Sequence, residues 1–322
     1  MEKNLGYNLG MILSSKIKVA VLRGGSSDGY DASLKTGKYV LSVLRDMPET
    51  YEPLDIFISK EGEWHHEGLV REPHRAVKYA DVIWNALHGS YGENGQVQKF
   101  LGSFQIPFTG SSAIASVLAT NQDMAKRLYQ RHFLATPAYK ILTENNLSEK
   151  QLIDVFRNFL PPIVVKPVRY ISGGMFLANT FNELKESIKK TFNLSPRVLI
   201  EEFIKGKNVT CTIIERGRGE KIYALLPVLS NIQQSDRLGT SEFRLRVNEN
   251  KEIERMAKQA HEALGLSHYS SSDFIVSPKR KIYILRTNPS PELHPDSLVH
   301  HSLDITGWRP RDFVDHVIKL AM

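Results

Sequence analysis

The segment Lys18-Val19-Ala20-Val21-Leu22-Arg23-Gly24-Gly25 sets the fold of the first part of the chain. Four consecutive apolar residues predict a short buried strand, and the two glycines predict a tight turn after it. Residues 32–44 then show helical spacing of apolar residues, with Ser and Asp before them. The sequence therefore predicts a strand, a glycine loop and a helix in that order.

Two further strands are predicted at residues 54–58 and 81–87, and the second runs directly into His88-Gly89-Ser90-Tyr91-Gly92. Strands that alternate with helices predict a parallel sheet, and ligands collect at the carboxyl ends of such strands. We therefore expect residues 16–111 to form a Rossmann-like unit that carries both glycine-containing loops at one edge.

The remaining chain predicts two more units, residues 112–205 and residues 206–322, and residues 1–15 are expected to be a loose tail. The second unit is expected to contain a helix at 113–130 and strands at 161–167 and 197–204. The third is expected to contain strands at 210–214 and 223–228, a helix at 251–264, and a hairpin of residues 271–276 and 281–288. These patterns predict α/β structure first and α+β structure after it.

Composition narrows the classes of function. The 322 residues carry a net charge of +7, but Lys and Arg are dispersed along the chain, which argues against a nucleic-acid partner. The single cysteine, Cys211, excludes an internal disulfide, and no apolar run approaches the ~18 residues of a membrane span. We expect a cytoplasmic protein with neither a nucleic-acid nor a membrane partner.

Two glycine-containing loops are candidate ligand sites. Residues 24–29 lie between strand and helix, where backbone amides can hold an anion, although a tight turn would need the same glycines. Residues 88–95 contain three glycines, and His88 and Glu93 could offer hydrogen bonds or charge to a ligand. The alternative for His88 is a structural histidine at a strand end.

Lys166 lies on the otherwise apolar strand Val164-Val165-Lys166-Pro167, where an ammonium group is costly unless it meets an anion such as a phosphate. A glycine-containing loop, residues 169–175, follows and could close over a phosphate. The alternative is a surface lysine on an edge strand.

The last hairpin carries polar residues at spacings that suggest a metal site. A turn at residues 277–280 predicts that Asp273 pairs near Ile284 and Ser271 near Arg286. Asp273 and Asn288 offer oxygen atoms of the kind that Mg²⁺ accepts. The alternative is a polar hairpin in solvent.

Six blocks in this order resemble the D-alanine–D-alanine ligase family of the ATP-grasp superfamily, over about residues 17–321. The blocks are residues 19–37, Leu87-His88-Gly89-Ser90-Tyr91-Gly92-Glu93-Asn94-Gly95, Ile106-Pro107-Phe108-Thr109-Gly110-Ser111, Val164-Val165-Lys166-Pro167, Val198-Leu199-Ile200-Glu201-Glu202-Phe203, and Asp273 with Asn288 and Ser297-Leu298.

The resemblance implies a two-part ATP-grasp after the Rossmann-like unit. It also implies an ATP-dependent carboxylate–amine ligase that acts through an acyl phosphate in peptidoglycan precursor synthesis. ATP and Mg²⁺ would be the cofactors, D-alanine or a similar molecule the substrate, and a homodimer the expected assembly. By position, ATP would contact Lys166, Glu201, Glu202, Phe203 and Ile204; Ser172 would act in the catalytic loop; His88 and Ser297 would face substrate; Asp273 and Asn288 would hold metal.

Five positions depart from the family pattern. Gly29, Gln122 and Asn208 stand where the family has a substrate-binding glutamate, a lysine and a ribose-binding glutamate. Ser271 stands at the position of the oxyanion-stabilising arginine, and Arg286 at that of the bridging metal glutamate.

We therefore expect Asp28 or Asp31 to serve the first substrate, Arg286 to supply the catalytic cation, and one Mg²⁺ to bind in preference to two. The covering loop, residues 231–240, also lacks the tyrosine that the family often carries there. Two alternatives stay open: an impaired relative that only binds nucleotide, and a ligase for a different amino or hydroxy acid.

Overall fold

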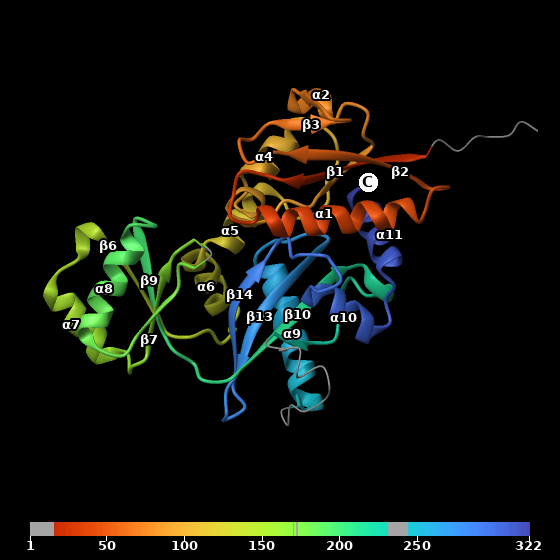
Figure 1. Cartoon of the computed structure of the whole chain (residues 1–322). Coiled ribbons are helices and arrows are strands. Elements are labelled where there is room, and N and C mark those ends of the chain that lie inside the picture. The colour runs from red at the N-terminus through yellow and green to blue at the C-terminus, as the bar shows by residue number, and fades with distance from the viewer. Residues whose placement is uncertain (1–15, 170, 172, 231–243) are drawn as a thin grey trace, which may run out of the picture.

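The computed structural model describes residues 16–169, 171, 173–230 and 244–322, and within them the chain forms three sheets (Figure 1). The predicted tail, Ser172 and residues 231–240 lie outside the described residues. No helix in the described ranges is long and apolar enough to cross a membrane.

The first sheet has the strand order β4-β3-β2-β1-β5. Its parallel part is β1 (Ile17–Gly24), β2 (Tyr51–Ile58) and β5 (Val82–Asn85), as the apolar runs predict. An antiparallel extension, β3 (Trp64–His66) and β4 (Leu69–Arg71), was not predicted. The helices here are α1 (Tyr30–Arg45), α2 (Pro73–Ala76), α3 (Gly89–Glu93) and α4 (Gln96–Gly102).

The second sheet is antiparallel, in the order β6-β9-β7-β8, and has its own apolar core. Its elements are β6 (Tyr139–Thr143), α7 (Glu149–Asn158), β7 (Ile163–Pro167), β8 (Phe176–Ala178), α8 (Phe181–Phe192) and β9 (Arg197–Glu202). Since β7 lies between β8 and β9, Lys166 does not lie on an edge strand, and that alternative is wrong.

The third sheet runs β11-β10-β13-β14, with β12 paired to β10. Its strands are β10 (Lys207–Glu215), β11 (Ile222–Ala224), β12 (Val228–Leu229), β13 (Tyr269–Val276) and β14 (Ile282–Asn288). The helices after residue 244 are α9 (Val247–Ala263), α10 (Leu298–Thr306) and α11 (Pro310–Ala321).

The helix predicted at residues 113–130 is two helices, α5 (Ala113–Thr120) and α6 (Gln122–Arg131). Asn121 breaks it, because its backbone is extended and its side chain accepts a hydrogen bond from the Met124 amide, which caps α6. Both helices pack into the core of the third sheet. The predicted unit boundary at 112 stays a prediction.

The first and third sheets share one apolar core. The chain enters the second sheet through residues 132–138 and leaves it after β9, and ion pairs of Lys126 with Glu201 and of Asp123 with Arg197 also link α6 to β9. Helices α1 and α11 lie between the first and third sheets in Figure 1, and Tyr269 and Phe313 pack with the strands of the first sheet. The second sheet stands apart in that view. A ligand between the second and third sheets would therefore contact two parts of the molecule that have separate apolar cores.

Candidate functional site

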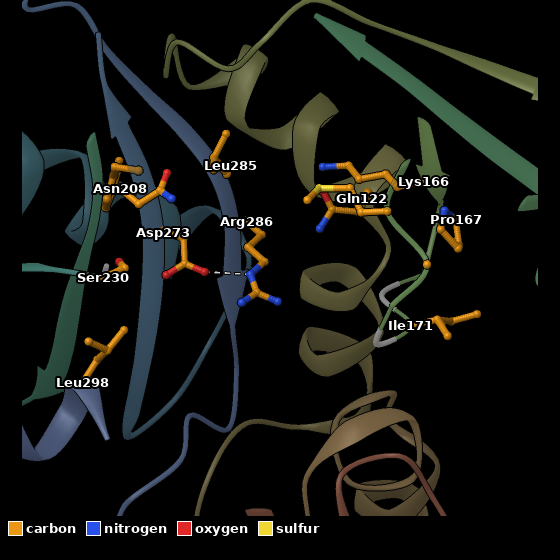
Figure 2. Close-up of a pocket in the computed structure, with 13 residues that line it drawn as sticks. Gln122, Lys166, Pro167, Ile171, Asn208, Ser230, Asp273, Leu285, Arg286 and Leu298 are labelled. Carbon is orange, nitrogen blue, oxygen red and sulfur yellow. Dashed lines mark hydrogen bonds and ion pairs between the residues drawn. The ribbon is translucent and has the colours of Figure 1, made fainter. Parts of the chain in front are cut away.

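A cavity of about 380 Å³ opens between the second and third sheets. Figure 2 shows Lys166, Pro167 and Gln122 on one wall and Asp273, Arg286 and Asn208 on the other. The apolar side chains of Met175, Phe274, Leu285 and Leu298 also line it. The cavity therefore has cations on both walls and an apolar part, which suits a nucleotide.

The hairpin wall differs from the predicted register. Phe274 pairs with Ile284, but Asp273 pairs with Arg286 and Ser271 with Asn288, because a bulge leaves Leu285 as an extra residue in β14. The predicted pairings of Asp273 with Ile284 and of Ser271 with Arg286 are therefore wrong. The turn residues alone could not reveal the extra residue.

The bulge places a carboxylate and a guanidinium side by side. Arg286 donates from Nε to Asp273 Oδ2 at 2.7 Å (Figure 2), and the hydroxyl of Thr210 donates to Asp273 Oδ1, also at 2.7 Å. Both oxygens of Asp273 are thus bound within the protein. Thr210 comes from the neighbouring strand β10, a partner that the sequence did not indicate.

The predicted metal ligands do not fit Mg²⁺ in this arrangement. Besides the engaged Asp273, the Oδ1 atom of Asn288 accepts a hydrogen bond from the Ser290 amide at 2.9 Å. No group of three acidic, His or Cys side chains that could hold an ion occurs among the residues the structure describes. Mg²⁺ usually keeps one or two carboxylate ligands, and here the one carboxylate is held by a cation.

Behind the opposite wall a buried lysine contacts Glu201, and it was not predicted from the sequence. Lys126, fully buried on α6, lies 2.7 Å from Glu201 Oε2 and donates to Thr136 Oγ1 at 2.7 Å. Lys166 Nζ donates to Glu201 Oε1 at 3.3 Å, so two ammonium groups share one carboxylate. Burial lowers the pKa of Lys126 to about 8 despite Glu201. The sequence does contain a signal for this lysine: Lys126 follows Gln122 by four residues, so in a helix the two side chains lie on the same face.

The predicted adenine hinge, residues 201–204, begins in β9, whose last two residues are Glu201 and Glu202. Glu201 is buried, Glu202 Oε1 accepts from the Ala138 amide at 2.9 Å, and Phe203 is 41% exposed. Phe203 and Ile204 lie in the short connection between β9 and β10, the link between the two sheets. Among the described residues that line the large cavity, none belongs to residues 201–204.

His88 is buried and has both ring nitrogens engaged. His88 Nδ1 donates to the Ser290 carbonyl at 3.0 Å, because a carbonyl oxygen can only accept. Thr36 Oγ1 lies 2.8 Å from His88 Nε2 and accepts from the Leu293 amide at 3.2 Å. Since Ser290 and Leu293 follow β14, His88 connects the first unit to the segment after the hairpin.

The two glycine loops fit into each other. A Cβ on Gly29 would lie 2.2 Å from the carbonyl carbon of His88, so no side chain fits there. Ser27 Oγ donates to the His88 carbonyl at 3.0 Å, and Asp28 Oδ1 accepts from the Ser90 amide at 3.1 Å. Backbone of residues 88–89 therefore occupies the space a side chain at 29 would need.

The other predicted substrate residues lie at helix starts. Asp31 is exposed in the first turn of α1. Ser297 caps α10, because its Oγ accepts from the His300 amide at 3.2 Å, and it is nearly buried. Leu298, next to it, lines the large cavity.

A second cavity of about 150 Å³ adjoins the first. It is lined by Gly89, Ser90, Glu93, Asn94, Thr120, Arg169 and Ile171, and Ile171 also lines the large cavity. Glu93 Oε1 accepts from the Gly89 amide at 3.2 Å. A carboxylate and a guanidinium therefore line a small cavity beside the larger one.

Comparisons with known proteins agree with this geometry. A family model described as the D-Ala–D-Ala ligase C-terminus matches residues 128–319. A D-alanine–D-alanine ligase of Aquifex aeolicus is 31% identical over 88% of this chain and 93% of its own length. This chain belongs to the D-alanine–D-alanine ligase family. A ligase of Methylibium petroleiphilum is 30% identical over 94% of this chain and 95% of its own length.

Solved D-alanine–D-alanine ligase structures share the fold. D-alanyl-alanine synthetase A of Vibrio cholerae matches with a TM-score of 0.84 at 23% identity, covering 95% of this chain and 98% of that one. The ligase of Bacillus anthracis, solved in complex with ATP, matches with a TM-score of 0.76 at 24% identity, covering 95% and 96%. The predicted Rossmann-like unit followed by an ATP-grasp is confirmed.

Proposed function

We propose that this chain is an ATP-dependent carboxylate–amine ligase that joins D-alanine or a similar small amino acid to a second amine substrate. The large cavity would hold ATP. The main support for this assignment is that Lys166 and Arg286 line the cavity from two different sheets. Preorganised cations on both sides of a transferring phosphoryl group stabilise the charge that develops during transfer.

The reaction would proceed in two steps. The γ-phosphoryl group of ATP passes to a carboxylate oxygen of the first substrate, and ADP leaves. The amine of the second substrate then attacks the acyl carbon and loses a proton, and inorganic phosphate leaves with that oxygen. Ile171 lines both cavities, so a substrate carboxylate in the small cavity would lie next to the phosphates in the large one.

The small cavity supports a zwitterionic first substrate. Glu93 could pair with an ammonium group and Arg169 with a carboxylate, and about 150 Å³ suits a molecule of the size of alanine. Since Gly29 admits no side chain, Glu93 would carry the role for which we had expected Asp28 or Asp31. His88 would act as a positioning residue, because its nitrogens are used within the protein.

The remaining assignments are proposals that rest on family membership. Ser172 and Arg286 would act in catalysis, Ser297 would face substrate, and Glu201, Glu202, Phe203 and Ile204 would surround adenine. The enzyme would work in the cytoplasm on peptidoglycan precursors, as a homodimer.

Release of inorganic phosphate tests the proposal. The purified chain receives ATP, Mg²⁺ and D-alanine, and we expect phosphate release and a dipeptide product. A panel of amino and hydroxy acids then identifies the substrate pair. Glu93→Gln should raise KM for the amino acid at least ~10-fold, the loss of one charged hydrogen bond. The exposed Glu61→Gln is the matched control.

Two observations favour a second function, a nucleotide-binding protein with little turnover. The hairpin carboxylate is already paired with Arg286, and backbone fills the space beside Gly29. ATP binding with no phosphate release from any substrate in the panel would support this function over the ligase.

A further inference from the structure

We propose that Arg286 serves as a built-in cation at the nucleotide site, so that this chain binds ATP without needing a divalent metal ion at the hairpin. The inference rests on the proposed ATP site and specifies the charge that this site offers to phosphates. Its basis is the hairpin geometry, in which a guanidinium stands beside the carboxylate of Asp273 on the cavity wall.

Both oxygens of the Asp273 carboxylate are already engaged within the protein. Asp273 accepts from Arg286 Nε at 2.7 Å and from the Thr210 hydroxyl at 2.7 Å, and Thr210 in turn lies 2.8 Å from the Ser230 hydroxyl. A metal ion at Asp273 would have to displace the guanidinium or lie next to it. Either change opposes binding, since like charges repel across a few ångströms.

The oxygen atom of the Asn288 side chain is engaged as well. Asn288 Oδ1 accepts from the Ser290 amide, and Ser290 is held in place by His88 Nδ1 through its carbonyl oxygen. Turning the Asn288 oxygen towards the cavity would give up a hydrogen bond inside a connected network. The oxygen atoms of Asp273 and Asn288 are therefore both used in hydrogen bonds within the protein.

The guanidinium of Arg286 lies on the cavity wall, where a phosphate group would bind. Arg286 is 39% exposed on its side chain and lines the cavity opposite Lys166 (Figure 2). A guanidinium donates hydrogen bonds in a planar fork that matches phosphate oxygens, whereas Mg²⁺ must first lose water. Arg286 can thus neutralise phosphate charge at the wall where a metal ion would otherwise do so.

Calorimetric titration of the full chain with ATP, once in EDTA and once in excess Mg²⁺, tests the inference. We expect dissociation constants that agree within about threefold, or about 0.7 kcal/mol. A constant at least ~10-fold lower in Mg²⁺, about 1.4 kcal/mol, would overturn it. No binding under either condition would instead refute the proposed ATP site, and the metal titration below still decides the question of the ion.

Titration with Mn²⁺ alone examines the hairpin directly. We expect no Mn²⁺ binding by the wild-type chain at millimolar concentration and clear binding by Arg286→Glu, which places two carboxylates side by side. Mn²⁺ binding by the wild type that Asp273→Asn abolishes would contradict the inference. Arg255→Glu is the control, because Arg255 is an exposed helix residue paired with Glu252.

Arg286→Met removes the charge without adding a carboxylate. We expect its affinity for ATP in EDTA to fall at least ~10-fold, while its melting temperature shows whether it is folded. An unchanged affinity in a folded variant would show that the guanidinium does not serve the nucleotide.

Discussion

Replacing Gly29 with alanine should force the two glycine loops apart. The new Cβ would lie 2.2 Å from the carbonyl carbon of His88, 2.3 Å from its oxygen and 2.5 Å from the Gly89 amide nitrogen. All three are backbone atoms, so no side-chain rotation can relieve the contact. The loop that begins at His88 would have to move by about an ångström to restore ordinary contact distances.

The expected cost follows from two contributions. Overpacking of this kind costs about 1–3 kcal/mol, and loss of the hydrogen bond from Ser27 to the His88 carbonyl adds about 1 kcal/mol. The first and third sheets share one core, and a cooperative unit of roughly 150–250 residues loses roughly 2–4 °C per kcal/mol. The melting temperature should therefore fall by about 4–16 °C. Thermal unfolding followed by circular dichroism measures this shift.

Gly102→Ala is the matched control, because nothing lies within 4 Å of its added Cβ and it ends helix α4. Its melting temperature should stay equal or rise slightly, since alanine favours helix. If Gly29→Ala melts within about 1 °C of the wild type, a shift smaller than any overpacking cost allows, the close contact between the loops is not what the geometry indicates.

Three further predictions concern single side chains. Lys166→Ala should weaken ATP binding at least ~10-fold by calorimetry, whereas the exposed Lys221→Ala should not; equal affinities would remove Lys166 from the site. Burial lowers the pKa of Lys126 from 10.5 to about 8, so the unfolded state binds this proton more tightly between those values and stability should rise with pH there. Denaturant titrations at pH 8 and pH 10 should show a larger free energy of unfolding at pH 10 for the wild type and no such gain for Lys126→Met. If the free energy of unfolding changes equally with pH in both proteins, the pKa of Lys126 is not lowered. Burial also raises the pKa of the Cys211 thiol, so a thiol reagent should modify it only after denaturation; rapid labelling of the native chain would contradict its burial.

The parallel part of the first sheet could be predicted from sequence because buried parallel strands are continuous apolar runs. Residues 19–22 and 82–84 show that pattern plainly. The β3–β4 hairpin could not, since each strand has three residues and β4 is exposed. Its two-residue turn, Glu67-Gly68, has positive φ at both positions, and only the glycine suggested it.

The candidate site was predicted in part. Lys166, Asp273 and Arg286, which the family resemblance assigned to the site, do line one cavity, whereas the predicted pairing within the hairpin was wrong. The partners that fix them come from distant segments: Lys126 reaches Glu201 from 75 positions away, and Thr210 reaches Asp273 from a neighbouring strand. Such pairings depend on tertiary packing, which local periodicity does not encode.

The extra residue in β14 also decides which side of the strand Arg286 faces. In a regular strand, position 286 would point to the same side as the buried Ile284, where a guanidinium would meet apolar side chains. The bulge lets Leu285 and Arg286 both line the cavity. The cavity-facing position of Arg286 thus depends on the length of β14 as well as on the residue itself, and losing one residue between Arg286 and the end of the strand would exchange the cavity-facing and core-facing positions beyond it.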